Sequence, residues 1–322
     1  MDLIRADAIT LTETDLGRLE ALYGIGRLER LGGFENVILR SLDPPRIIRL
    51  THTSRRSLGS IEAEVAFMEH LVKASVPVAA PVNALDGHRV VGFETDGGQP
   101  CVVYCMQEAP GAIRYPAEWS DSDIVAYGDL LGRLHAAAQS YPSKQGVGRP
   151  AWFEPFFDFG IGLMDDLEVV QLFHDSKRTA LDHPVGGADL LIHQDAHFWN
   201  LHVDEASRLT LFDFDDCGYG TAEHDIAIVL FYWLLAIWPD PSAEVRRFLQ
   251  LFLEGYQRHA ALADDWPEGM DRILKVREVE IYLLLTMEEI DPNGVEALFM
   301  SGRRDRLLAG TPYLGVRLES LV

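Results

Sequence analysis

The sequence predicts an α+β protein of two parts, a strand-rich N-terminal part and a larger, mostly helical C-terminal part. Runs with the period-two alternation of half-buried strands are concentrated before residue 107. After that point apolar residues recur every three or four positions, as they do on one face of a helix. Residues 107–111 contain the proline and glycine typical of a linker. We therefore expect two domains, residues 1–107 and 108–322.

The N-terminal part is predicted to contain several strands and one main helix. Strands are expected at residues 37–39, 46–50, 89–94 and 101–106, after a short leading helix at 14–22. The main helix spans residues 60–73, and Glu64 falls inside its apolar face. A buried carboxylate is costly unless it is paired, so Glu64 predicts a basic partner. The alternative is that Glu64 lies at the rim of this face and reaches water.

The C-terminal part is predicted to contain helices at residues 123–138, 226–238, 244–261 and 270–290. The apolar run 226–238 is too short to cross a bilayer and is expected to be a buried helix. Asp225 directly precedes this run and can cap it. Residues 217–220, Cys-Gly-Tyr-Gly, are expected to form a flexible turn. His135 is expected to be a structural histidine with satisfied hydrogen bonds.

The stretch with the clearest chemical content is residues 191–216, LIHQDAHFWNLHVDEASRLTLFDFDD. Two short apolar runs flank a polar turn in its second half, which predicts an antiparallel hairpin. Strand periodicity then brings Asn200 and Asp213 nearly opposite each other at the open end. Such hard oxygen ligands suit Mg²⁺, and Asp195 nearby can orient an attacking hydroxyl. The alternative is that all three are ordinary turn and strand-end residues.

Residues 193–200, HQDAHFWN, followed by FDFDD at 212–216, resemble the catalytic signature of the aminoglycoside phosphotransferase and choline kinase-like superfamily. That family usually has glycine where Gln194 stands. The resemblance implies a two-lobed protein-kinase-like fold, with an antiparallel sheet and one main helix in the N-terminal lobe and a larger, mostly helical C-terminal lobe. In this fold Asp195 would accept or orient a hydroxyl. Asn200 and Asp213 would hold Mg²⁺. His193 would support the catalytic loop, and His197 is either a third polar contact or a surface residue.

The same resemblance assigns further residues to the nucleotide, which is ATP or GTP. Gly32 and Gly33 would form the loop that covers it. Arg49 would contact its phosphates while paired with Glu64. The main chain at Gln107 and Glu108 would receive its base, and Asp225 would brace the catalytic loop.

The function implied is Mg²⁺-dependent transfer of the γ-phosphoryl group to a hydroxyl of a small, cationic molecule such as an amino sugar or amino alcohol. One alternative is a Ser/Thr protein kinase of the bacterial stress-response type, which shares this fold. Another is a nucleotide-binding relative without catalysis. Intact Asp195, Asn200 and Asp213 argue against the second alternative.

Composition sets the outer limits. The 322 residues carry a formal charge of −22, which disfavours nucleic acid and anionic membranes as partners and suits a cationic substrate. The acidic residues of the last third either face the acceptor or form a solvated helix face; they are Asp264, Asp265, Glu268, Asp271, Glu288, Glu289 and Asp291. Three cysteines without a CxxC pair, and no visible secretory signal, favour the cytoplasm. The aromatic-rich residues 152–159 are expected to form a core or interface cluster, or else to stack on a ligand.

Overall fold

The computed structural model describes residues 6–33, 35–142, 148–154, 161, 164–183, 189–237, 242–287 and 290–321. The chain forms two compact units. The first comprises Met1–Pro110, Val147–Arg149 and Thr210–Asp215. The second comprises Gly111–Gly146, Pro150–Leu209 and Asp216–Val322. The first unit thus takes two short segments from later in the chain.

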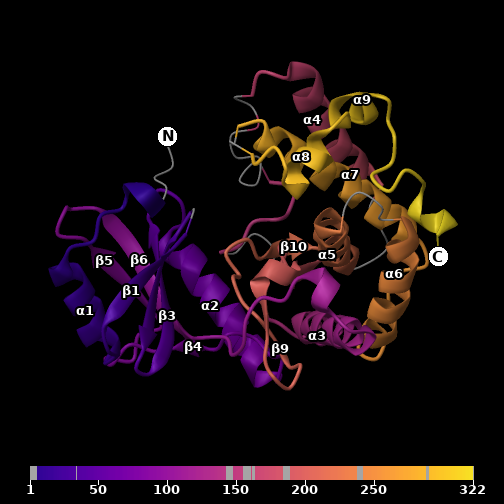
Figure 1. The fold of residues 1–322 in the computed structure, drawn as a ribbon. Coiled ribbons are helices and arrows are strands. Elements are labelled where there is room, and N and C mark those ends of the chain that lie inside the picture. The colour runs from indigo at the N-terminus through magenta and orange to yellow at the C-terminus, as the bar shows by residue number, and fades with distance from the viewer. Residues whose placement is uncertain are drawn as a thin grey trace. The chain divides into compact units, whose positions relative to one another are not determined.

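The first unit is built on a six-stranded antiparallel sheet (Figure 1). Its strand order is β1 (Leu28–Gly32), β2 (Val37–Leu42), β3 (Pro45–His52), β6 (Pro100–Gln107) and β4 (Pro81–Val82). Strand β5 (Val90–Glu94) also pairs with β6. The predicted antiparallel sheet is confirmed, and β1 and β4 were not predicted as strands.

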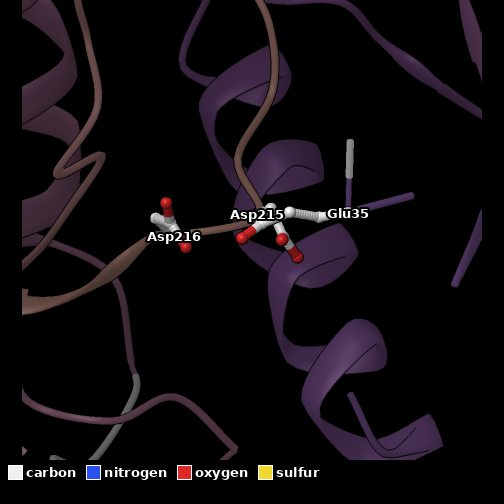
Figure 2. Close-up of side chains that lie close together, drawn as sticks. All are labelled: Glu35, Asp215 and Asp216. Atoms are coloured by element: carbon white, nitrogen blue, oxygen red, sulfur yellow. The ribbon is translucent and has the colours of Figure 1, made fainter. Parts of the chain in front are cut away.

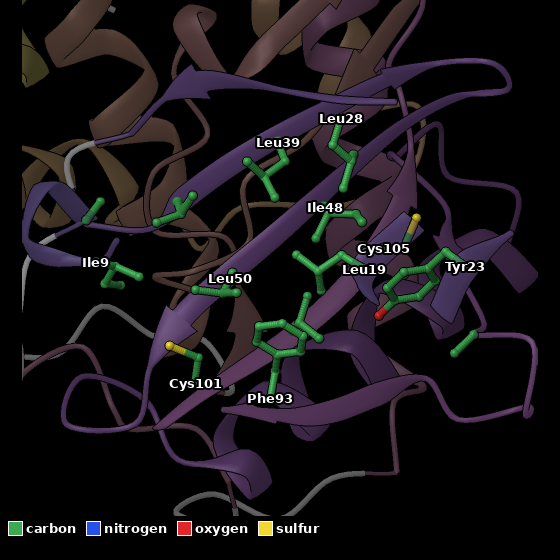
Figure 3. Packing of buried hydrophobic residues seen from close by; sticks show 14 residues of the cluster. Ile9, Leu19, Tyr23, Leu28, Leu39, Ile48, Leu50, Phe93, Cys101 and Cys105 are labelled. Carbon is green, nitrogen blue, oxygen red and sulfur yellow. The ribbon is translucent and has the colours of Figure 1, made fainter. Parts of the chain in front are cut away.

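Each face of this sheet meets a helix. Helix α1 (Glu13–Tyr23) contributes Leu19 and Tyr23 to a buried apolar cluster on one face, shown in Figure 3. Ile48 and Leu50 of β3 belong to the same cluster. Because side chains alternate along a strand, the intervening Arg49 points to the opposite face, where it meets helix α2 (Leu58–Lys73). The period of β3 therefore decides which face carries the charge.

The second unit is mostly helical, as predicted. Its longer helices are α3 (Asp121–Gln139), α4 (Leu167–Asp182), α5 (Ala222–Ala236), α6 (Ser242–Tyr256) and α7 (Trp266–Leu285). Two short helices follow, α8 (Val295–Met300) and α9 (Arg303–Leu308). The predicted buried helix is α5, in which 13 residues from Glu223 to Leu235 are buried. Within the described part of the chain, no helix is long and apolar enough to span a membrane.

Two local predictions in this unit are wrong. Residues 217–220 are not a flexible turn, because β10 (Gly218–Gly220) pairs antiparallel with β7 (Leu190–Ile192). Glycine fits there since a Cβ on Gly220 would press against the Ile192 side chain. Asp225 is not the cap of α5: the helix begins at Ala222 after Thr221, so Asp225 lies inside its first turn. Strands β8 (Leu201–Val203) and β9 (Leu209–Leu211) form the predicted two-stranded pair.

Helices α3 and α6 pack unusually close because glycines line their contact. A Cβ on Gly128 would overlap the carbonyl oxygen of Phe252, and one on Gly132 would press on the backbone of Tyr256. A Cβ on Gly255 would likewise overlap the Val125 carbonyl. Glycine lowers helix stability by about 0.5–1 kcal/mol relative to alanine. Close helix packing explains why these positions nevertheless carry it.

Gly128→Ala is therefore expected to destabilise the protein by about 1–3 kcal/mol, through overpacking against α6. Gly17→Ala is the matched control, because Gly17 lies within α1 and its Cβ would meet nothing within 4 Å. That control should stabilise by up to about 1 kcal/mol. Chemical denaturation measures both; equal effects of the two substitutions would contradict the packing argument.

The C-terminal segment is held to α7 by a carboxylate that is poorly placed for ionisation. Asp271 accepts a hydrogen bond from the Leu318 amide at 2.9 Å. Burial raises the pKa of Asp271 from 3.8 to about 6. The folded protein thus binds this proton more tightly than the unfolded chain does. The contribution to stability is present below pH 4 and is lost as the pH rises through 6.

Asp271→Asn removes the charge but keeps an oxygen for the Leu318 amide. We expect Tm to rise by about 2–4 °C at pH 7.5 and to change little at pH 4, where the native group is already protonated in the folded state. Differential scanning calorimetry at the two pH values checks this, with exposed Asp264→Asn as the control. An equal shift at both pH values would show that the charge is not the cause.

Candidate active site

Asp195 lies on the loop between β7 and a 3₁₀ turn at Phe198–Asn200 in the second unit. Asp225 fixes this loop, because its carboxylate accepts hydrogen bonds from the main-chain amides of His193 at 2.9 Å and Gln194 at 2.6 Å. Burial opposes ionisation of Asp225, but the hydrogen bond from His135 outweighs it and the pKa is lowered. The brace implied by the family resemblance is therefore present. The ring of His193 also contacts the Asp195 amide, at 3.2 Å.

His135 is a structural histidine, as predicted. It is fully buried, and its two ring nitrogens lie 2.8 Å from the Tyr256 hydroxyl and 3.0 Å from Asp225. One carboxylate thus connects helix α3, helix α5 and the loop that carries Asp195. The arrangement holds the loop with main-chain contacts, which leave the Asp195 side chain available for chemistry.

The Asp195 carboxylate has three side-chain neighbours. The Asn200 amide nitrogen lies 3.1 Å from Oδ2, His197 Nε2 also lies 3.1 Å from Oδ2, and Arg277 Nη2 lies 3.1 Å from Oδ1. Burial alone would raise the pKa of Asp195, but the electrostatic interaction and hydrogen bond with His197, together with the charge of Arg277, outweigh it and hold that pKa well below 3.8. Asp195 is therefore ionised at neutral pH. His197 is a polar contact rather than a surface residue.

Arg277 was missed by the sequence analysis. It lies on α7 and also donates to the Tyr232 hydroxyl at 2.6 Å and to Glu280 at 2.7 Å. The available signal was its position four residues after Ile273, on a partly apolar helix face. Its position on the helix predicts a partly buried arginine. It does not predict the partner, because Asp195 lies 82 positions away in sequence.

In the first unit, the predicted ion pair is confirmed: Arg49 Nη1 lies 2.7 Å from Glu64 Oε1, and both side chains are buried. Tyr104 joins them, since its hydroxyl donates to Glu64 at 2.8 Å. Burial lowers the pKa of an arginine, but Asp215 and Glu64 outweigh it and raise that of Arg49 well above its usual value. Glu64 is fully buried, which excludes the alternative that it reaches water.

Asp215 is the centre of a wider arginine cluster, which the sequence analysis missed. Its carboxylate pairs with Arg49, with Arg55 at 3.0 Å and with Arg56 at 2.9 Å. Its carbonyl oxygen accepts from Arg56 and Arg149. Figure 2 shows Glu35 beside Asp215, and Arg55 pairs with both. Carboxylate oxygens engaged by three arginines are poor metal ligands, so we interpret Asp215 as a structural anion.

Asp213 lies in the first unit and behaves differently from Asp215. Its side chain is 50% exposed, its Oδ1 lies 3.7 Å from Arg49 Nη1, and its φ is +61°. A positive φ is unfavourable for a residue other than glycine and is common at functional sites. Asn200 belongs to the second unit, where its amide nitrogen donates to Asp195. A magnesium site shared by Asn200 and Asp213 stays a prediction.

The other residues assigned to the nucleotide also lie in the first unit. Gly32 and Gly33 have φ of +126° and +111°, and a Cβ on Gly33 would overlap the Asn36 carbonyl, so the loop requires glycine. Gln107 ends β6 and donates its amide to the Ala80 carbonyl at 2.8 Å. Glu108 pairs with Arg40 at 2.7 Å. None of these contacts tests nucleotide binding.

A cavity of about 60 Å³ lies next to Arg277 in the second unit. Its polar lining includes Gln194 and His224, and Trp152 and Phe173 contribute to its apolar wall. The predicted aromatic cluster at 152–159 is described only as far as residue 154. Of the acidic residues expected either to face the acceptor or to form a solvated helix face, Glu268 and Asp271 line a different cavity, of about 540 Å³, while Glu288 and Glu289 lie outside the described residues.

Comparison with known proteins identifies the family of this chain. The sequence model of the Phosphotransferase enzyme family matches residues 27–263, so the chain belongs to this family. The amicoumacin kinase of Bacillus subtilis (strain 168) is 27% identical over 329 residues, covering 96% of each chain.

Two solved structures share the fold. An amicoumacin kinase in complex with AMP-PNP, Ca²⁺ and Ami superposes with a TM-score of 0.84 at 24% identity, covering 96% of this chain and 97% of that one. A microcompartment-associated aminopropanol kinase superposes with a TM-score of 0.71 at 21% identity, covering 95% and 100%. The predicted protein-kinase-like fold is confirmed.

Asp215→Asn should destabilise the first unit by about 3–5 kcal/mol, because it leaves buried arginines without their counter-charge. The control is Glu69→Gln, which breaks the ion pair between Arg89, half exposed, and Glu69 at 2.8 Å and should change stability by less than about 1 kcal/mol. Urea unfolding at pH 7.5 measures both. Similar small losses in the two variants would mean that Asp215 does not organise the cluster.

Proposed function

We propose that this protein transfers the γ-phosphoryl group of ATP or GTP to a hydroxyl of a small molecule, with Mg²⁺ as the cation. The observation that carries the proposal is the ionised, hydrogen-bonded Asp195 on a braced loop. Phosphoryl transfer needs positioning and charge neutralisation more than covalent work by the protein. A carboxylate with a lowered pKa suits the task of orienting a hydroxyl.

In the proposed reaction the hydroxyl oxygen forms a bond to the γ-phosphorus while the bond to the bridging oxygen of the leaving nucleoside diphosphate breaks. Asp195 accepts the hydrogen bond of the attacking hydroxyl and then its proton, late in the step because its pKa is low. Asp195 returns the proton to solvent afterwards. Arg277 holds the carboxylate in place through its 3.1 Å contact.

The cation would be held by Asp213 and Asn200. A half-exposed carboxylate and an amide oxygen are hard ligands of the type Mg²⁺ prefers. The Asn200 amide nitrogen already donates to Asp195, so the amide oxygen is the atom that suits a cation. When bound, Mg²⁺ neutralises phosphate charge. The complex of a related kinase with AMP-PNP and Ca²⁺ supports nucleotide and divalent-cation binding.

Nucleotide binding is proposed for the first unit. Gly32 and Gly33 would cover the phosphates, and the main chain at Gln107 and Glu108 would receive the base. Arg49 is 1% exposed and engaged by Glu64, Tyr104 and Asp215. A phosphate must therefore compete with one of these partners to reach its guanidinium.

The acceptor is proposed to be a small amine that carries a hydroxyl. Related proteins are named as kinases of amicoumacin and of aminopropanol, and aminopropanol has both groups. The net charge of −22 favours a cationic acceptor over an anionic one.

Release of the nucleoside diphosphate should be measured with ATP and with GTP, in the presence and absence of Mg²⁺. The candidate acceptors are amicoumacin, aminopropanol, aminoglycosides, choline and casein. We expect Asp195→Asn to lower kcat by about 10²–10⁴-fold. The same variant should keep the Mg²⁺- and nucleotide-dependent rise in Tm, whereas Asp213→Ala should lose it. EDTA should abolish turnover.

Asp175→Asn, an exposed substitution on α4, serves as the control and should behave like the wild type. Full turnover in Asp195→Asn would reject its assigned role. Phosphorylation of casein alone would favour a protein kinase. A wild type without nucleotide-dependent stabilisation or turnover would favour a relative without catalysis.

A further inference from the structure

Gln194 occupies a backbone conformation that disfavours its side chain. Its φ is +65°, in the left-handed region, which costs an L-residue about 1–2 kcal/mol. Glycine would adopt the same conformation without this penalty. The main chain cannot move away easily, because the Gln194 amide is bound to Asp225 at 2.6 Å.

The side chain of Gln194 carries a second penalty. It is only 8% exposed, and its Nε2 atom is buried with no hydrogen-bond partner among the described residues. An unsatisfied buried polar group costs about 1–3 kcal/mol. Strand β10 leaves room for it, since a Cβ on Gly218 would overlap that same Nε2 atom. A bound group that accepts a hydrogen bond from Nε2 would offset part of this cost.

Gln194 lines the 60 Å³ cavity next to Arg277, and two other residues of its lining also carry unsatisfied atoms. His224 is 7% exposed with Nδ1 unpaired, and Arg277 Nε is also unpaired, within the described residues. Burial lowers the pKa of His224 to about 4, so the ring is neutral at pH 7. The apolar wall comprises Trp152, Phe173, Ile228, Ile273 and Val276. Arg277 joins this cavity to Asp195, which it contacts at 3.1 Å.

We propose that this cavity is a subsite for an uncharged oxygen-bearing group of the phosphate acceptor, and that Gln194 Nε2 donates a hydrogen bond to that oxygen. The inference rests on the proposed function, because it makes Gln194 a specificity-determining residue for the same reaction. The oxygen is a carbonyl or a hydroxyl other than the one that attacks phosphorus.

The chemistry of the lining selects this class. The unpaired atoms of Gln194 and Arg277 are donors, so they complement an acceptor atom. The charged lining pairs two cations, Lys177 and Arg277, with two carboxylates, Asp216 and Glu280, and this balance favours an uncharged group. A carboxylate is disfavoured because Glu280 and Asp195 already balance the charge of Arg277. The cavity admits a few water molecules, so it fits a small group at one end of the acceptor and not the whole molecule.

The test compares two acceptors that share the same amino alcohol and differ in one substituent, the methyl group of 1-amino-2-propanol and the carboxamide of 3-amino-2-hydroxypropanamide, whose carbonyl supplies the oxygen. We expect the wild type to favour the amide in kcat/KM by roughly tenfold, the value of about one hydrogen bond. Gln194→Met keeps the volume without the donor, and Gln194→Gly removes the side chain. Both should lose the preference through KM for the amide, with KM for ATP unchanged.

The effect of these substitutions on protein stability is measured separately. Gln194→Gly should keep or raise Tm, because glycine relieves the positive φ. Ser75→Gly, at an exposed position with φ of +62°, is the matched control for that backbone effect and should leave acceptor choice unchanged.

Calorimetric binding of both compounds is measured beside turnover, so that the two proposals can fail independently. Binding that favours the amide and depends on Gln194, without turnover, would reject the phosphotransferase proposal alone. Equal use and equal binding of the two compounds, or a preference that survives in Gln194→Met, would overturn the subsite. Absence of binding of either compound to the wild type would also overturn it.

Discussion

The buried charge around Asp215 is the constraint on which the first unit depends. Arg49 must lie under the sheet because the period of β3 directs it there, and a buried guanidinium requires counter-charge. Glu64 supplies part of it from α2. Asp215 supplies the rest from a segment that lies more than 160 positions later. The need of buried Arg49 for a counter-charge thus explains why residues 210–215 belong to the N-terminal unit.

The position of Asp213 follows from the ion pairs of Asp215. It lies two residues before Asp215, and its positive φ turns the chain there. The second unit uses a similar device, because buried Asp225 binds the amides that precede Asp195 and is paired with His135. In each unit, a buried carboxylate without a proposed chemical role fixes the segment that carries a candidate site aspartate. The structural anchoring is thus carried by Asp215 and Asp225 and not by the proposed site residues Asp195 and Asp213.

Sequence reasoning succeeded where the signal is local. The helical period placed Glu64 on a buried face and predicted a basic partner, and the family resemblance named that partner as Arg49. It failed where partners are remote, since nothing near Arg277 or Asp215 in the sequence names the groups they bind. The error at residues 217–220 has the same origin. Glycines favour turns locally, but here they allow β10 to lie close against Gln194 and Ile192.

The second unit contains two kinds of buried polar group, those that are paired within the protein and those that are not. Arg303 and Glu278 are both buried and lie 2.6 Å apart, so their burial is compensated within the fold. Three residues that line the cavity beside Arg277 carry unsatisfied nitrogens, one of them also has a strained backbone, and no described residue compensates these costs. A folding optimum would place glycine at 194 and apolar groups around it. Retaining glutamine there lowers stability next to Asp195, which is the expected trade-off where a surface is shaped for a ligand rather than for packing.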